Sequence, residues 1–585
     1  MSDDATATAE TKLPKDTAAE KGMVNVQIDG HWIQVPRGTR MIEAAKMAEK
    51  EIPHYCYHPK LSSPGNCRMC LVQMGMPPRP APGEEPKYGD DGYQEIGWMP
   101  RPVIACANTV AENMGIRTTG ELVEKTREGV MEFLLINHPL DCPICDQAGE
   151  CKLQEFSVEH GRGESRFKED KIKKPKNVDI GKNIRLDDER CIMCSRCIRF
   201  MDEVAEEPVL GFSQRGTHTS VTVHPGYRLD NNYSLNTADI CPVGALTSND
   251  FRFQMRVWFL KETKSIDVNC GTGANTIIWT RGNEIFRVTP RQNDEVNSAW
   301  MPDSHRLAFN QLQTDDRLTS PMVKKGRKHE ETSWLEATAK AAEVLARQQP
   351  GEVAVIASGR LSNEEIFLAS KISGALGTEL LSIVPRMKES DGKLISADRN
   401  PNTTGASLIW GTDDPGAKLD AIRAGISSGK IKALLCLGED LLEEADFKKE
   451  DLKKLDDLVV SHTHANPTAS LARVVLPSVG FAEKRATYVN VTGRLQRTNQ
   501  AVIAPGEVRD DWESLAALLA KLDPEYEVPA SMDGVLRAIS TETKAFAGQT
   551  FGSIGDLGVQ ITETGVTIPL LEKERARIES GQIVG

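Results

Sequence analysis

The stretch 190-RCIMCSRCIRF-200 decides the fold of this chain, because it sets Cys191, Cys194 and Cys197 at C-x2-C-x2-C spacing. Three cysteines so spaced form a tight loop that can wrap one corner of a cubane iron–sulfur cluster, as in the bacterial ferredoxin run C-x2-C-x2-C-x3-C-P. The nearby fourth cysteine of that run is missing, but Cys241-Pro242 follows after 43 intervening residues. We expect Cys241 to close the set, and this pattern disfavours zinc, the other ion that takes four thiolates.

A second group of cysteines lies nearer the N-terminus in the pattern C-x10-C-x2-C-x35-C. Plant-type 2Fe–2S proteins use C-x4-C-x2-C and a distant fourth cysteine, and the shared feature is one C-x2-C pair flanked by remote cysteines. A zinc ribbon usually has two C-x2-C knuckles, so the spacing favours a 2Fe–2S cluster over zinc. The group, called group 1 from here on, is Cys56, Cys67, Cys70 and Cys106.

Between these lies a group with only three thiols, in the pattern H-x3-C-x2-C-x5-C. The histidine supplies the ligand that a 4Fe–4S cluster would otherwise lack, since each iron needs one external ligand. Three cysteines with one histidine are also a zinc arrangement, so spacing alone leaves zinc open. Group 2 is His138, Cys142, Cys145 and Cys151, and the cysteines quoted first, Cys191, Cys194, Cys197 and Cys241, form group 3.

Eleven of the thirteen cysteines thus fall in three groups, and with one histidine they make twelve ligands for three sites. A line of redox centres implies electron transport rather than chemistry on a bound substrate. Clustered cysteines in a reducing compartment are more often metal ligands than disulfides, and an odd number fits this. Arg196 and Arg199 lie within the group 3 motif, where positive charge would stabilise a reduced cluster; surface salt bridging is the alternative.

The bulk composition sets broad limits. At 585 residues the chain should hold several domains, and its net charge of −13 argues against nucleic acid as a partner. No run of 18 apolar residues exists, so we expect no transmembrane segment. The start of the chain is acidic and rich in Ala and Thr. It has neither the apolar core of a secretion signal nor the Arg-rich, acid-poor composition of a mitochondrial transit peptide. We therefore predict a disordered tail on a bacterial cytoplasmic protein.

The pattern of apolar residues predicts two kinds of fold. MVNVQIDGHWIQVP (23–36) alternates like two strands around an Asp29-Gly30 turn, and a helical stretch follows, as in a ferredoxin-type β-grasp domain. GELVEKTREGVMEFLLINH (120–138) predicts a helix of about five turns that ends near His138, because Pro139 cannot continue it. Strand and helix patterns alternate after residue 260, which favours an α/β domain with a largely parallel sheet. We find no dinucleotide or P-loop motif.

These residues resemble the G subunit of the bacterial NADH:quinone oxidoreductase, respiratory complex I, and its mitochondrial 75-kDa relative. The resemblance is carried by CYHPKLSSPGNCRMC, GVMEFLLINHPLDCPICDQAGEC, RCIMCSRCIRF and DICPVGALTS, and less specifically by FAEKRATYVNVTGRLQRT. It runs from about residue 23 to about residue 520. It implies a 2Fe–2S cluster on group 1, a His-ligated 4Fe–4S cluster on group 2 and another 4Fe–4S cluster on group 3, with no catalytic residue in this chain.

Two departures from the family pattern matter. The stretch 71–105 before Cys106 is longer than usual and rich in Pro and Gly, so the ligand role of Cys106 rests on the sequence ACANTV around it. Some bacterial members carry a further cysteine motif at the start of the α/β half, where this chain reads DVNCGTGAN. Asp267 and Ala274 stand where two cysteines would be, so we expect no extra cluster. Cys270 and the other unassigned cysteine, Cys436, are interpreted as core residues.

The resemblance implies a multidomain fold of α+β and α/β parts: a β-grasp 2Fe–2S domain, a 4Fe–4S domain with one histidine and three cysteine ligands, a ferredoxin-like 4Fe–4S domain, and a molybdopterin-oxidoreductase-like α/β domain without molybdopterin. The predicted domains are a tail (1–22), the 2Fe–2S domain (23–119), the His-ligated 4Fe–4S domain (120–160), the ferredoxin-like domain (185–255), the molybdopterin-oxidoreductase-like domain (260–520) and a C-terminal extension (521–585).

The implied function is electron transfer from an FMN-bearing NADH dehydrogenase subunit towards quinone, coupled to proton translocation by other subunits. The implied partners are that flavin subunit, other peripheral-arm subunits and, indirectly, the membrane arm, so the chain would lie peripherally on the cytoplasmic side of the inner membrane. The alternatives are a stand-alone oxidoreductase of the formate dehydrogenase or hydrogenase type, and a zinc-stabilised scaffold. A hydrogenase needs more cysteines than Cys270 and Cys436 after the ferredoxin part.

Overall fold

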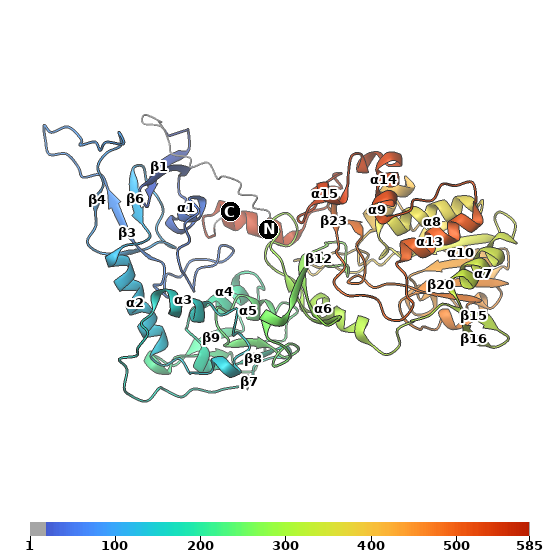
Figure 1. The fold of residues 1–585 in the computed structure, drawn as a ribbon, viewed down its shortest axis with the longest axis horizontal. Coiled ribbons are helices and arrows are strands. Elements are labelled where there is room, and N and C mark those ends of the chain that lie inside the picture. The colour runs from blue at the N-terminus through green and yellow to red at the C-terminus, as the bar shows by residue number, and fades with distance from the viewer. Residues whose placement is uncertain (1–18, 584–585) are drawn as a thin grey trace, which may run out of the picture. The chain divides into compact units, whose positions relative to one another are not determined.

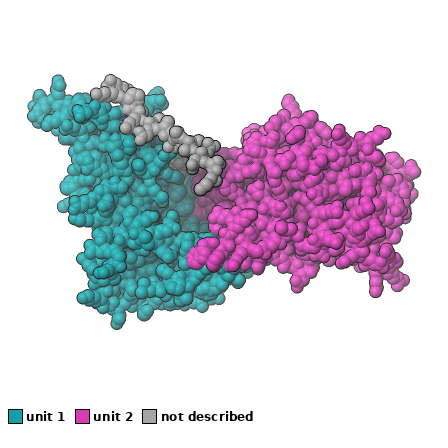
Figure 2. Space-filling model, viewed as in Figure 1, with its two compact units in different colours: residues 1–257, 574–585 teal, residues 258–573 magenta. Residues whose placement is uncertain are grey.

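The computed structural model describes residues 19–583, so the predicted tail over 1–22 lies, up to residue 18, outside the described residues. Two compact units make up the chain (Figure 2). Unit 1 comprises residues 1–257 and 574–585, and unit 2 comprises residues 258–573. No helix among the described residues is long and apolar enough to cross a membrane. The domain boundaries expected within each unit stay predictions.

Unit 1 is built from short elements around long loops. Its strands are β1 (Met23–Ile28), β2 (His31–Pro36), β3 (Leu71–Met76), β4 (Gly97–Trp98), β5 (Val103–Ile104), β6 (Met114–Arg117), β7 (Val178–Asp179), β8 (Ile184–Leu186), β9 (Leu210–Ser213), β10 (Ser220–Val223) and β11 (Leu246–Ser248). Its helices are α1 (Met41–Met47), α2 (Glu121–Leu135), α3 (Lys152–His160), α4 (Arg196–Glu203) and α5 (Asn236–Asp239).

The expected hairpin, helix and cysteine loop are present at the start of unit 1. β1 and β2 pair around Asp29 and Gly30, which both have positive φ, 48° and 87°, as a two-residue hairpin turn requires. The sheet has the order β2-β1-β6-β3-β4, with β1 and β6 parallel. Helix α1 packs on it through a shared apolar core, so the β-grasp fold is confirmed.

Helix α2 ends at Leu135, three residues before the expected end at His138. The Lys171 ammonium donates to the carbonyl oxygens of both Leu135 and Ile136, at 2.8 Å each. These bonds satisfy carbonyl groups that a longer helix would have used. The residues 136–141 are thereby released from the helix and lead into the loop that carries the group 2 cysteines.

Unit 2 contains the larger sheet and most of the helices (Figure 1). Its strands are β12 (Lys261–Ile266), β13 (Asn275–Arg281), β14 (Glu284–Pro290), β15 (Met322–Lys325), β16 (Lys328–Glu331), β17 (Val353–Ala357), β18 (Leu381–Ile383), β19 (Ala433–Leu437), β20 (Asp457–His462), β21 (Val474–Pro477), β22 (Thr487–Val489), β23 (Arg494–Arg497) and β24 (Val559–Gln560). Its helices are α6 (Asp303–Arg306), α7 (Trp334–Ala346), α8 (Asn363–Ala375), α9 (Thr403–Trp410), α10 (Leu419–Ser427), α11 (Leu441–Glu444), α12 (Lys449–Leu452), α13 (Asp511–Leu522), α14 (Met532–Glu542) and α15 (Phe551–Ile554). Helix α16 (Pro569–Glu579) begins in unit 2 and ends in unit 1.

The seven-stranded sheet of unit 2 has the order β16-β15-β21-β20-β19-β17-β18, and its last five strands are parallel. Each face of this sheet packs against helices. Successive side chains of one strand point to opposite faces, so neighbouring residues of β17 lie in different cores. Val355 packs in the core formed with α7, α8 and α13, whereas Ile356 packs with α10 and α12. The expected open α/β domain is confirmed, and Cys436 of β19 is buried in the second of these cores.

Candidate metal centres

The four cysteines of group 3 line one small cavity of about 20 Å³. Strand β11 pairs with β8, and the Asp187 N–H donates to the Ala245 carbonyl at 2.7 Å. This pairing brings the segment after Cys241 back to the segment before Cys191, across the 43 residues that separate the cysteines. The structure therefore brings together all four residues that the motif predicts.

The group 3 loop is shaped to surround a sulfur-ligated centre. Met193 and Ser195 both have left-handed backbones, with φ of 54° and 61°, which curl the loop between the cysteines. Burial raises the pKa of the Cys194 thiol to about 12. Several thiolates in so closed a space would be unfavourable without a cation, and binding a metal supplies it. The residues present fit an iron–sulfur cluster.

All four cysteines of group 1 are buried. The backbone N–H of Cys56 donates to the Cys67 sulfur at 3.4 Å, and the Cys106 thiol hydrogen-bonds with both Cys56 and Cys70. Cys106 reaches them because β5 pairs with β3, and the Ala105 N–H donates to the Cys70 carbonyl at 3.0 Å. The long insertion thus returns as a strand beside the one that follows Cys70. The structure places Cys106 with the other three cysteines of group 1.

Group 2 is more open to solvent. Cys142 is exposed, Cys145 is buried and Cys151, just before α3, is half-buried. Burial, together with the charges of Lys171 and Arg190, lowers the pKa of His138 to about 4, so its ring is neutral at physiological pH. A neutral imidazole is the form that binds metals. His138 lies beside the cysteine loop, with Asp141 among its charged neighbours, and its role as a ligand stays a prediction.

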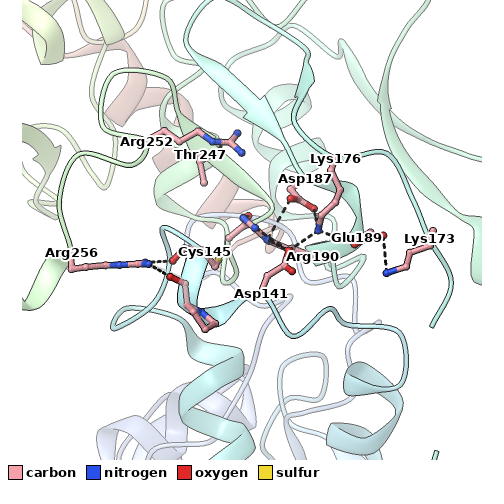
Figure 3. Close-up of polar contacts among 12 residues, drawn as sticks. Asp141, Cys145, Lys173, Lys176, Asp187, Glu189, Arg190, Thr247, Arg252 and Arg256 are labelled. Atoms are coloured by element: carbon pink, nitrogen blue, oxygen red, sulfur yellow. Dashed lines mark hydrogen bonds and ion pairs between the residues drawn. The ribbon is translucent and has the colours of Figure 1, made fainter. Parts of the chain in front are cut away.

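Arginines surround the group 2 loop, as Figure 3 shows. Arg190, only 5% exposed, donates to Asp141 at 3.0 and 3.1 Å. Arg256 donates to the carbonyl oxygens of Pro143 and Cys145. These cations offset negative charge on cysteine sulfurs. Sequence spacing contains no signal for Arg256, because it lies more than a hundred residues from the loop it holds.

Two arginines of α4 join group 3 to group 1. Arg199 donates to the Cys56 carbonyl at 2.5 Å and to the Cys194 carbonyl at 3.5 Å. Arg196 donates to the carbonyl oxygens of Ile240, at 3.1 Å, and Tyr57. Each guanidinium therefore bonds the backbone of both cysteine loops. Of the two roles considered from sequence, surface salt bridging does not describe these contacts.

The segment after Cys241 joins group 3 to group 2. The Lys152 N–H, next to Cys151, donates to the Pro242 carbonyl at 3.2 Å. Gly244 lies directly against group 2, since a Cβ on it would stand 2.2 Å from the Cys145 sulfur. Arg190 Nη1 also lies 3.5 Å from the Gly244 carbonyl oxygen. Group 3 thus has direct contacts with both other groups.

We expect Arg199→Gln to lower the reduction potentials of the clusters on groups 1 and 3, because it removes a positive charge near both. One charge about 10 Å away, at an effective dielectric constant of about 20, contributes about 1.7 kcal/mol, roughly 70 mV per electron. EPR-monitored redox titration measures the shift. Arg199→Lys, which keeps the charge, should shift the potentials much less; equal shifts in both variants would mean that the charge is not the cause.

The chain matches five domain families along its length. They are the 2Fe-2S iron-sulfur cluster binding domain (21–121), the NADH-ubiquinone oxidoreductase-G iron-sulfur binding region (127–166), the ferredoxin-like domain of NADH-quinone oxidoreductase subunit 3 (181–247), the NADH-ubiquinone oxidoreductase NDSU1/NuoG-like 4Fe-4S domain (260–310) and the molybdopterin oxidoreductase family (317–408 and 411–521). The three groups lie within the first three matches. Unit 2 therefore has the molybdopterin-oxidoreductase-like fold.

Relatives that match along much of the chain agree with these domain matches. The NADH-quinone oxidoreductase G subunit of Rickettsia felis is 41% identical over 62% of this chain and 50% of its own length. The G subunit of Rickettsia typhi is 40% identical over 88% of this chain and 74% of its own length. The mitochondrial NADH-ubiquinone oxidoreductase 78 kDa subunit of Neurospora crassa is 32% identical over 86% of this chain and 81% of its own length. The chain belongs to the family of NADH-quinone oxidoreductase G subunits.

Proposed function

We propose that this chain is the iron–sulfur electron-transfer subunit of an NADH:quinone oxidoreductase, with a 2Fe–2S cluster on group 1 and 4Fe–4S clusters on groups 2 and 3. The observation that carries the proposal is the contact of group 3 with both other groups. Arg196 and Arg199 bond it to the group 1 loop, and Gly244 packs on Cys145 of group 2. Three centres in one contiguous unit suit electron relay rather than separate structural roles.

The contacts favour an order in which electrons pass from group 1 through group 3 to group 2. Rapid-freeze EPR of the assembled complex after mixing with NADH tests this order. The group 1 and group 3 signals should appear before the group 2 signal. In a variant without the group 3 cluster, group 1 should still be reduced while group 2 reduction slows sharply. Unchanged reduction of group 2 in that variant would contradict the order.

His138→Cys tests the ligand set of group 2. An anionic thiolate in place of a neutral imidazole should keep a cluster but lower its reduction potential, because the oxidised state gains more from the added negative charge. A redox titration followed by EPR gives the potential. His54→Cys is a matched control, since His54 hydrogen-bonds the backbone carbonyl of Ile52 and lies outside the three groups. An unchanged group 2 potential in His138→Cys would show that His138 is not a ligand.

We propose that unit 2 holds no pterin cofactor. Parallel α/β sheets bind ligands beyond the carboxyl ends of their strands. There, after β19, the fully buried Glu439 is bonded by Arg386 at 2.8 Å, and Glu444 is bonded by the same guanidinium at 2.5 Å. Arg360 lies 3.3 Å from Glu444 as well, so the two carboxylates are paired with two arginines, and the buried Arg386 guanidinium is already engaged and not free to bind the phosphate of a molybdopterin. Unit 2 is therefore proposed to serve without that cofactor.

The proposed partners are an FMN-bearing subunit that oxidises NADH and further peripheral-arm subunits that pass electrons towards quinone, with membrane subunits reached indirectly. The relatives' names place them in NADH-quinone oxidoreductases. We propose a peripheral position on the bacterial cytoplasmic side. Cys436 is buried in an apolar core, which argues against a role as the metal ligand of a molybdenum enzyme.

A further inference from the structure

Three side chains with metal-binding atoms meet in unit 2, outside the three cysteine groups. Their ligand atoms all lie within 4.8 Å of one another, and no other trio of His, Cys, Asp or Glu within residues 19–583 meets so closely. Asp267 directly follows β12, Cys270 lies in the turn to β13, and His305 lies in α6. Asp267 Oδ2 and His305 Nδ1 are 2.6 Å apart.

The trio is buried and its members are held in place. The side chains of Asp267 and His305 are 1% and 10% exposed, and Cys270 is fully buried. Asn269 donates to Asp267 Oδ1 through both its backbone N–H, at 3.0 Å, and its side-chain amide, at 2.6 Å. These bonds leave Asp267 Oδ2 to face His305. Such support from neighbouring groups is typical of the surroundings of metal ligands.

The spacing of the trio fits one ion better than an iron–sulfur cubane. In tetrahedral zinc sites the bond lengths put neighbouring ligand atoms about 3.4 to 3.6 Å apart. The 2.6 Å between Asp267 and His305 would have to widen by less than about 1 Å to admit the ion. A 4Fe–4S cluster needs four external ligands, and Ala274 cannot supply one. The match to a 4Fe-4S domain over 260–310 therefore covers a stretch whose ligand set differs.

The charges also suit a divalent cation. Asp267 Oδ2 and His305 Nδ1 are 2.6 Å apart, and the Cys270 sulfur lies within 4.8 Å of both. A Zn²⁺ ion bound to one carboxylate, one thiolate and one neutral imidazole would form a site of zero net charge, and the thiol proton and any imidazole proton would be released to solvent on binding. The soft thiolate favours zinc over magnesium or calcium.

We propose that Asp267, Cys270 and His305 bind one Zn²⁺ ion, with the fourth position left to water. The ion ties the β12–β13 turn to α6. It carries no electrons, since zinc has no redox chemistry in proteins, and so adds a redox-inert metal to the proposed electron-transfer function. In this proposal Cys270, a fully buried residue, is a metal ligand.

Metal analysis of the full-length chain in the assembled complex tests the site. Wild type should hold about one zinc per chain beside its iron. Asp267→Asn, which keeps the size of the side chain, and Cys270→Ser should each lose that zinc and keep the iron. Cys436→Ala, which removes the other cysteine of unit 2 outside the trio, should keep both metals. Zinc that persists in Asp267→Asn and Cys270→Ser would overturn the proposal.

If the variants fold poorly, zinc-edge X-ray absorption of the wild-type protein still tests the site, because it identifies the atoms bound to the zinc. One sulfur together with nitrogen and oxygen neighbours is expected. A shell of sulfur alone would place the zinc in the cysteine groups of unit 1 and overturn the proposal, as would absence of zinc. Loss of four irons in Cys270→Ser would show that Cys270 binds an iron–sulfur cluster, and this result would also overturn the zinc proposal. The iron content of groups 1 to 3 is measured in the same samples, so a failure of the zinc proposal can be distinguished from a failure of the electron-transfer proposal.

Discussion

Cys194→Ala is expected to remove the group 3 cluster and to stop electron flow from NADH to quinone in the assembled complex. Iron should fall from about ten to about six per chain, because one 4Fe–4S cluster is lost. The effect should be large because the group 3 loop is the segment that contacts both other groups. Iron analysis, EPR and NADH:quinone activity measure the three consequences.

Cys436→Ala is the control for this variant. Cys436, like Cys194, is buried, but it packs in the apolar core of unit 2. The substitution should leave iron, EPR signals and activity near wild type, with only a modest loss of stability from the smaller side chain. Full activity in Cys194→Ala would contradict the relay role of group 3, and iron loss in Cys436→Ala would contradict its assignment to the core.

Gly244→Ala should damage group 2 although Gly244 belongs to the segment after a group 3 cysteine. The added Cβ would stand 2.2 Å from the Cys145 sulfur, whereas carbon atoms pack at about 3.5 to 4.0 Å and sulfur is larger. The loop from Cys142 to Cys151 must therefore shift. We expect a lost or altered group 2 EPR signal and a stability loss of about 1–3 kcal/mol.

The control for Gly244→Ala is Gly129→Ala in α2. Apart from its chain neighbours and the nearby backbone of α2, no atom lies within 4 Å of a Cβ at that position. Alanine favours helices over glycine by about 1 kcal/mol, so this variant should be as stable as wild type or slightly more so. A normal group 2 signal in Gly244→Ala would mean that Gly244 does not hold this loop against group 3.

The sequence predicts those motifs whose shape depends only on residues within the motif. The C-x2-C-x2-C loop needs only its own residues to set its shape, and the Asp29-Gly30 hairpin needs only a two-residue turn with positive φ. The parallel strands of unit 2 were also predictable, since short apolar runs alternate with helical patterns.

Contacts between distant segments could not be read in the same way. The position of Cys106 depends on the pairing of β5 with β3, which spacing does not reveal. The end of α2 depends on Lys171, whose bonds to Leu135 and Ile136 come from a charged linker. The bridging role of Arg199 and the meeting of His305 with Asp267 depend on which elements pack together.

The central claim is that groups 1, 2 and 3 hold iron–sulfur clusters. Iron and acid-labile sulfide analysis of the complex, with low-temperature EPR after reduction, tests it most directly. The account predicts about ten irons and ten sulfides in this chain, and signals of one 2Fe–2S and up to two 4Fe–4S clusters. A colourless chain with about three zinc ions in groups 1 to 3 and no sulfide would contradict it.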